Sequence, residues 1–447
     1  MKSGDILPSH GGYTPLQPQN SPRRPSWVRR VLLVTGILSL GFLLRSYDGR
    51  RLGQLLSILS LNGEIVPQEI TLPAGVSTKD CVPWIYDEFP DEDGYLFKAH
   101  TSLQLPIDTP SLFFLKAGST IVGGFHVIQV DEISDSAKID ITLKTRQEDM
   151  IDLTSICSLV KEGGGDGLGI LADFPPRRES PKERIDIVVS LPKSSTGDPL
   201  EINSFESTLS FVAHEFKLDD SVFFHQLLVS GTAIPLSVET IVADEVRVDN
   251  GISPISGTFN VSDALFLKTT TGAIDVTANL FNDPSAEKST SLDLLATVGA
   301  ITGTINLFSQ SQTETGAVLD HADTPSFDIR AQASVTPIHL TLPFIHPGTI
   351  LNLSTKATLG STLLELHESF EGRFNIQTGR FRGQASLRVR NEDEVDDPEG
   401  RGRKRVVEFA RKTTGSIQGR VGWGQLVSGK EGSVEIQTTF GNAELKL

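Results

Sequence analysis

Cysteine, aromatic residues and long apolar runs are all scarce in this chain of 447 residues. The two cysteines, Cys81 and Cys157, are too few for a structural zinc site, and no closely spaced pair of histidines adds to them. Aromatic residues make up 7% of the chain and apolar residues 38%, whereas Ser, Thr and Gly are abundant. Such a composition favours thin β layers with many turns over a large helical core.

Positive charge is also missing from most of the chain. The first 51 residues carry eight basic and two acidic side chains, but the whole chain has a net charge of −16, so residues 52–447 carry −22. An acidic body repels the phosphates of nucleic acids, and no basic patch interleaved with aromatic residues interrupts it. The sequence therefore predicts no nucleic-acid partner.

Signatures of catalysis are absent from the sequence as well. The nine histidines are scattered, no Gly-x-Ser-x-Gly sequence occurs, and the glycine run at 163–167 is not followed by the Gly-Lys-Ser/Thr of a phosphate-binding loop. The acidic run at 91–94 lacks the spaced ligands of a calcium loop. We therefore predict no catalytic residue, no cofactor and no metal site.

The N-terminal segment predicts a membrane anchor. Residues 1–26, rich in Pro and Ser, are predicted to be a disordered cytosolic tail. Residues 31–44 are uncharged, and with Trp27 and Tyr47 at the flanks they extend to about 21 positions, enough for one signal-anchor helix over 27–47. A cleaved signal peptide and a buried core helix are the alternatives. Residues 48–75 then form a stem, the body is lumenal or extracellular, and the lipid bilayer is a partner.

Three features of the body depend on this location. The sequons at Asn260 and Asn352 predict N-glycosylation. In an oxidising lumen, Cys81 and Cys157 would pair and close a loop of 75 intervening residues, and two buried free thiols are the alternative. Lys404-Arg405 ends a basic run that follows the acidic residues 391–400, which predicts either a solvated loop or a dibasic processing site.

Period-two alternation, typical of half-buried β-strands, runs through the body. Alternating segments within residues 76–235 predict a small β-sandwich-like region. Residues 236–447 predict a β-repeat domain, because the pattern of strand, Thr-x-Gly-Ala-Ile, strand recurs there. The motif occurs at 270–274 and 297–301, with looser copies at 248–252 and 413–417.

The predicted fold class is thus all-β, and two architectures fit the repeat. In an irregular β-solenoid each motif marks a corner, and its glycine adopts a positive φ. In an antiparallel sandwich each motif marks a hairpin. The recurrence of strands of like length with the same corner residues favours the solenoid.

The repeat resembles the putative-adhesin family of domains of unknown function, whose members show degenerate repeats of the same strand–corner–strand type. The matching residues are those of the four motif copies, and the resemblance covers roughly residues 236–447. Together with the Pro/Ser-rich leader, the chain is similar to uncharacterised single-span fungal membrane proteins. The resemblance implies a stack of β-strands with no assigned catalytic residues.

The polar face of the predicted strands supplies the functional expectation. Thr and Asn dominate this face after both corners, and their hydroxyl and amide groups are suited to hydrogen-bonding glycan hydroxyls. We expect a membrane-anchored, non-enzymatic surface, adhesion or cell-wall-contact module whose partner is a cell-wall glycan or another surface protein. A carbohydrate-active enzyme on a β-solenoid scaffold is the alternative.

Overall fold

The computed structural model describes residues 70–87, 94–173, 183–286, 288–310, 324–379, 383–390, 396–424 and 431–447. The chain divides into two compact units, Met1–Val66 and Pro67–Leu447. All described residues belong to the second unit, so the predicted tail (1–26), the predicted anchor (27–47) and most of the stem (48–75) lie outside them. Among the described residues, no helix is long and apolar enough to cross a membrane.

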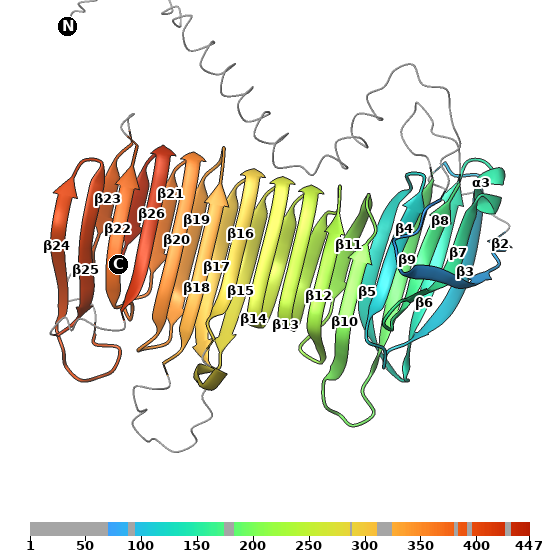
Figure 1. Cartoon of the computed structure of the whole chain (residues 1–447), viewed down its shortest axis with the longest axis horizontal. Coiled ribbons are helices and arrows are strands. Elements are labelled where there is room, and N and C mark those ends of the chain that lie inside the picture. The colour runs from blue at the N-terminus through green and yellow to red at the C-terminus, as the bar shows by residue number, and fades with distance from the viewer. Residues whose placement is uncertain are drawn as a thin grey trace, which may run out of the picture. The chain divides into compact units, whose positions relative to one another are not determined.

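The described part of the chain is almost entirely β-structure, which confirms the predicted all-β class. Its helices are a four-residue α-helix, α3 (Asp149–Asp152), and the 3-10 helix η1 (Pro284–Ala286). Hydrogen bonds join all 27 strands into one continuous sheet. The strand pairings wind this sheet into two layers, here called A and B, which form the stack in Figure 1.

Layer A contains the longer series of strands. In stacking order it consists of β1 (Val76–Val82), β7 (Thr154–Lys161), β8 (Asp166–Ala172), β4 (Leu112–Gly118), β10 (Leu200–Thr208), β12 (Val222–Gly231), the second halves of β13 (Leu236–Ile252) and β14 (Ile255–Thr271), β16 (Thr290–Val298), β18 (Ser326–Ala333), β20 (Ile350–Leu359), β26 (Gly432–Phe440), β22 (Gly372–Thr378), β25 (Ser416–Trp423) and β24 (Arg405–Thr413).

Layer B contains the strands that alternate with these along the chain. In stacking order it consists of β2 (Ile85–Asp87), β3 (Phe97–Pro106), β6 (Ser136–Thr145), β9 (Arg184–Lys193), β5 (Val122–Ile133), β11 (Val212–Lys217), the first halves of β13 and β14, β15 (Ile274–Asn282), β17 (Ile301–Ser309), β19 (Ile338–Ile345), β21 (Thr362–Leu366), β27 (Ala443–Lys446) and β23 (Ala385–Arg388).

Parallel pairing dominates the stack, as the solenoid alternative predicts. In the described strands, antiparallel pairs occur only toward its two ends, around β1–β3, β6 and β7 and around β24 and β25. Parallel pairs begin with β4 and β8. The stack therefore continues across residue 235, where the sequence predicted a boundary between a sandwich-like region and a repeat domain.

The alternation in the sequence sets which side chains fill the space between the layers. In β15, Ile274, Val276, Ala278 and Leu280 are buried, and β17 repeats the pattern. These side chains belong to one apolar core that runs from Ala99 to Leu447. A strand buries one face in this way because successive side chains point to opposite sides of the sheet.

The order of the strands departs from the order of the chain at both ends. The pair β26–β27 lies between β20–β21 and β22–β23, and Figure 1 shows the red β26 beside strands that are earlier in the chain. At the other end, β4–β5 lies between β8–β9 and β10–β11. In both places a pair of strands from elsewhere in the chain is inserted between two other pairs of strands and forms hydrogen bonds with both of them.

The corner glycines are required mainly by the close approach of neighbouring turns. A Cβ atom on Gly360 would lie 2.2 Å from the carbonyl oxygen of Thr336, and one on Gly251 would lie 2.5 Å from that of Thr232. Neither residue has a positive φ. Gly272 and Gly299 combine such contacts with φ values of +159° and +155°, so the predicted positive φ holds at these corners and not at every corner.

The fourth motif copy, at 413–417, is a different structure. It forms the turn between the antiparallel strands β24 and β25, with Thr413 opposite Ser416. The sequence motif is thus compatible with two kinds of tight turn. Whether it forms a corner between the layers or a hairpin within one layer depends on how the flanking strands pair. Because β24 is the last strand of layer A, its edge is exposed, and it carries Arg411, Lys412 and a bulge, which oppose pairing with another chain.

Candidate functional site

A groove crosses the outer face of layer A near the C-terminal end of the stack. Its larger part, about 690 Å³ in volume, lies over β26, β22, β25 and β24. A smaller depression of about 180 Å³ lies over β18, β20 and β26, and the two share Ser433 and Glu435 in their linings. The groove therefore runs across six neighbouring strands rather than along them.

Two rows of outward-facing side chains form the walls. Wall one, in stacking order, consists of Asp328, Asn352, Ser433, Arg373, Arg420 and Glu408. Wall two consists of Arg330, Ser354, Glu435, Asn375 and Gln418. Each row is a ladder, because neighbouring members are direct cross-strand partners.

The floor between the walls is backbone. The residues between the two rows include Leu353, Val434 and Phe374, whose side chains point inward and are buried. At Gly419 the floor has no side chain at all, and a Cβ atom there would lie 2.5 Å from the ring of Phe374. The backbone groups of this floor already pair with neighbouring strands.

Wall two is organised by hydrogen bonds between its own amide and carboxylate groups. The Nδ2 of Asn375 donates to Glu435 (3.3 Å), and its Oδ1 accepts from the Nε2 of Gln418 (3.2 Å). Two neighbours outside the wall, Gln377 and Gln437, donate to Asn375 (3.1 Å) and to Glu435 (2.7 Å). Asn375 and Glu435 are therefore each held in one orientation by at least two partners, and Gln418 is held by Asn375.

The two arginines of wall one share a carboxylate. The Nε atoms of Arg373 and Arg420 each donate to the Oε2 of Glu431 at 3.2 Å. The Glu431 side chain is 14% exposed, whereas the Arg373 side chain is 62% exposed, so the carboxylate is covered and the Arg373 guanidinium faces solvent. A single carboxylate thus fixes both guanidinium groups beside the groove.

The Thr and Asn residues that suggested a binding surface lie on the outer face of layer B. Thr258, Thr277, Thr304 and Thr341 form one ladder there. In the next row, Asn279 donates to Asn260 (2.7 Å) and Asn306 donates to Asn279 (2.8 Å). These bonds link the three amides into one ladder.

The row beyond the asparagines is aromatic. The rings of Phe281, Phe308 and Phe344 stack with centroid distances of 5.0 and 4.9 Å. Cross-strand ladders of this kind stabilise a sheet. This face is therefore strongly ordered by its own contacts, and the recess formed by polar groups lies on layer A.

The two predicted glycosylation sites differ in their surroundings. Asn260 ends the asparagine ladder of layer B: its Oδ1 accepts from Asn279, and its Nδ2 donates to no other described residue. Asn352 is a member of wall one: its Nδ2 donates to Asp328 (3.1 Å), and its Oδ1 accepts from Ser433 (3.1 Å). The predicted attachment atom at Asn352 therefore lies at the groove.

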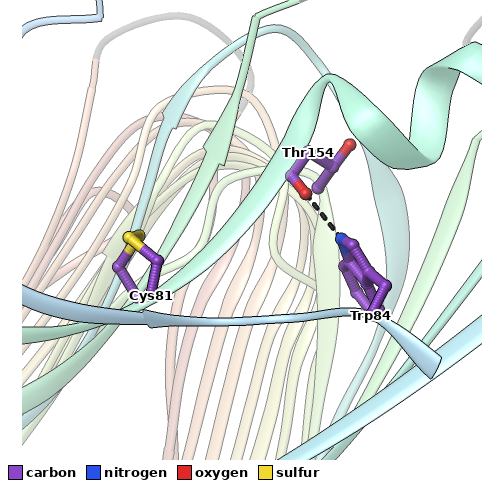
Figure 2. The surroundings of a disulfide bond; sticks show 4 residues. Cys81, Trp84 and Thr154 are labelled. Atoms are coloured by element: carbon purple, nitrogen blue, oxygen red, sulfur yellow. Dashed lines mark hydrogen bonds between the residues drawn. A yellow bond between two sulfur atoms is a disulfide. The ribbon is translucent and has the colours of Figure 1, made fainter.

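Cys81 and Cys157 are joined by a disulfide in the structure, with the sulfur atoms 2.02 Å apart. The two residues face each other across the antiparallel pair β1–β7. Nearby, the indole N–H of Trp84 donates to the backbone carbonyl of Thr154 at 2.6 Å (Figure 2). The disulfide joins β1, the outermost strand of layer A, to β7. The hydrogen bond holds Trp84, which follows β1, at Thr154, the first residue of β7.

One histidine is buried inside the stack. His214 is 1% exposed, its Nδ1 lies 2.9 Å from the carbonyl oxygen of Val212, and its Nε2 lies 2.6 Å from the hydroxyl of Ser207. These partners define the neutral tautomer in which Nδ1 donates and Nε2 accepts. Burial disfavours the charged form and lowers the pKa of His214 to about 4.

This buried histidine predicts a pH dependence of stability. An unfolded histidine has a pKa of about 6.5, so below that pH the unfolded chain binds a proton that the folded chain rejects until about pH 4. We expect the free energy of unfolding to fall by about 3 kcal/mol as the pH drops through this window. The measurement is urea unfolding at pH 7.0, 5.5 and 4.5.

A pair of variants separates the contribution of His214 to this pH dependence of stability from the contribution of carboxylates, which also bind protons in acid. His214→Gln should reduce the loss of stability between pH 6.5 and 4, whereas His225→Gln, at an exposed side chain, should retain the loss seen in the unaltered protein. An equal loss of stability in both variants would show that His214 is not the source.

The charged insertion contains an ordered turn in its described part. Arg403 donates to Asp397 through its side chain (2.9 Å) and its backbone N–H (3.1 Å), and the side-chain bond lowers the pKa of Asp397 well below its usual range. Arg405 begins β24, is 3% exposed and lies near the Trp423 ring. Cleavage after Lys404-Arg405 would therefore require β24 to leave the sheet.

Metal-binding and catalytic groupings were not predicted, and the described ranges contain no group of three or more His, Cys, Asp or Glu side chains placed to hold a metal ion. The acidic run at 91–94 lies outside those ranges except for Gly94. The groove itself was missed by sequence reasoning. Its walls come from six strands that span residues 328–435, and no local motif marks them.

No family model and no curated protein matches this chain. Among solved structures it is similar to a "putative cell adhesion protein" from Clostridium sporogenes, at 9% identity and a TM-score of 0.18, over 78% of this chain and 99% of the other. It is also similar to a "putative adhesin" from Parabacteroides merdae, at 14% identity and a TM-score of 0.23, over 60% of this chain and 96% of the other. A third such protein, from Parabacteroides distasonis, has 12% identity and a TM-score of 0.21, over 60% and 92%.

TM-scores this low carry no inference about the present chain. The resemblance to the adhesin-like family therefore stays a prediction that no family model supports, and the likeness to single-span fungal membrane proteins is likewise unsupported.

Proposed function

We propose that this protein is a non-enzymatic surface module that contacts cell-wall glycans, held at a membrane by residues 27–47 with its β-stack in the lumen or outside the cell. The observation that supports it most is the groove on layer A. Its walls offer amides, carboxylates, hydroxyls and guanidinium groups, which together donate to and accept from sugar hydroxyls.

The organisation of the groove favours binding. Glu435 holds Asn375, and Glu431 holds Arg373 and Arg420, so a ligand meets groups that are already oriented. Fixing polar groups before the ligand arrives reduces the entropy cost of association.

The test is a pair of assays on the full-length protein. Protein made in a host that attaches no N-glycans should bind to a glycan array displaying cell-wall polymers, and it should release no shorter fragments from the same polymers. Fragments would instead identify a carbohydrate-active enzyme, with Glu408 and Glu435 as the first carboxylates to replace. Binding to none of the polymers would refute the proposed function.

A further inference from the structure

We propose that the groove on layer A binds one chain of a neutral, linear polysaccharide lying across the strands, and that an N-glycan on Asn352 blocks it. The inference rests on the proposed function, because it names the site and the ligand class for the same activity. The inference goes beyond that function in three respects: the ligand lies across the strands, it is neutral, and a covalent modification of Asn352 prevents its binding.

The dimensions of the groove select a linear polymer. Six strands at the usual spacing of about 4.8 Å give a length of ~24 Å, and residues two apart along a strand set the walls about 7 Å from each other. A recess that is long, narrow and open toward solvent accommodates several units of a single extended chain. A branched or globular ligand would contact only part of it.

The floor argues against an extended peptide. Peptides bind sheets by adding a strand to an exposed edge, where backbone N–H and C=O groups lack partners. Here the floor residues Leu353, Val434 and Phe374 lie in strands that are paired on both sides. Away from the edge strand β24, recognition must therefore use side chains, and those of the walls are suited to hydroxyl groups.

The charges of the walls balance. The walls carry three arginines (Arg330, Arg373, Arg420) and three carboxylates (Asp328, Glu408, Glu435), and Glu431 adds a carboxylate that is bonded to Arg373 and Arg420. A strongly charged polymer would gain attraction from one set and meet repulsion from the other. A neutral polymer uses both sets, since each sugar hydroxyl both donates and accepts a hydrogen bond.

The amides of wall two keep unused hydrogen-bonding capacity. An amide group has two N–H donors and a carbonyl that accepts twice. Gln418 uses one donor toward Asn375, which leaves its carbonyl oxygen and second N–H for a ligand. Because Asn375 and Glu435 hold the neighbouring positions in fixed orientations, these groups are presented in line along the groove.

The sequon at Asn352 lies within wall one. A glycan on its Nδ2 would start in the smaller part of the groove, between Asp328 and Ser433, and Ser433 also lines the larger part. The attached sugars would then occupy the space that the polymer needs. Asn260 lies on layer B, so a glycan there would leave the groove open.

The first experiment uses full-length protein from a host that forms disulfides and attaches no N-glycans. The probes are immobilised hexasaccharides of β-1,3-glucose, β-1,4-N-acetylglucosamine and α-mannose, with polygalacturonate as the charged comparison. Asn375→Ala combined with Gln418→Ala should weaken binding to the neutral oligosaccharide by about 10-fold, since two hydrogen-bonding groups are lost. Ser433→Trp, which fills the groove at an exposed position, should abolish binding.

The control is Thr277→Ala combined with Thr304→Ala on layer B, which should bind like the unaltered protein at temperatures below its own midpoint of thermal unfolding. If neutral polymer binds but the groove variants bind normally, the site assignment is wrong and the proposed function stands. Tighter binding of polygalacturonate would overturn the ligand class. Absence of binding to every polymer would remove the proposed function itself.

The second experiment compares the same protein from a host that attaches N-glycans. With a glycan on Asn352 shown by peptide mass, binding should be at least 10-fold weaker than for the unmodified protein. Asn260→Gln from the same host should remain equally weak. Recovery of binding in Asn260→Gln, undiminished binding with the Asn352 glycan present, or an unmodified Asn352 would each overturn the proposed block.

Discussion

Replacing Gly299 with alanine is expected to destabilise the stack by about 4 kcal/mol, from a backbone clash and an unfavourable φ together. The added Cβ atom would lie 1.7 Å from the carbonyl oxygen of Gly272 in the neighbouring turn, and φ at Gly299 is +155°. The neighbouring corner cannot move aside, because the strands on either side of it are paired along their length. Urea unfolding followed by circular dichroism measures the loss.

Alanine substitutions at two further glycines separate the two contributions to this loss of stability, the steric clash and the unfavourable φ. Gly360→Ala introduces only the clash, 2.2 Å from the Thr336 carbonyl oxygen, and should cost about 2–3 kcal/mol. Gly197→Ala introduces only the φ penalty, at +82° with nothing within 4 Å, and should cost about 1 kcal/mol. If Gly299→Ala cost no more than Gly197→Ala, close stacking of the corners would not explain why glycine is needed there.

The corners show how far the sequence predicts this fold. Alternation after Gly272 and Gly299 predicted which side chains of β15 and β17 are buried, because a strand has only two faces. The same pattern predicted a corner at both positions. The reason for the glycine was only partly predicted, since the contact with the preceding turn depends on which segment lies there.

The strand order near the ends was beyond the reach of sequence reasoning. β26 alternates like its neighbours, so nothing in its pattern distinguishes a place after β25 from its actual place between β20 and β22. Any strand that buries one face fits any slot of similar length in a parallel stack. The groove depends on this order, because Ser433 and Glu435 of β26 connect its two parts.

The disulfide yields the second prediction of large effect. Replacing Cys81 and Cys157 together by serine is expected to reduce the free energy of unfolding by about 4 kcal/mol, from the loop that the bond closes in the unfolded chain. β1 is mostly exposed and pairs with β7 alone among the described strands, so without the bond little apolar burial holds it. Hydrogen exchange should show early loss of protection in β1 and β7.

Trp84→Phe is the matched control, because it removes the hydrogen bond to Thr154 and part of a side chain packed against the core but leaves the disulfide intact, and it should cost about 2 kcal/mol. Alkylation of the unreduced, denatured protein from its own cells tests the bond and the compartment together. Since disulfides persist in the secretory pathway and are rare in the cytosol, the proposed location requires both thiols to resist the reagent. Modification of both, with stability equal to that of the double serine variant, would mean that the bond does not form in the cell and that the stack is not exposed to an oxidising compartment.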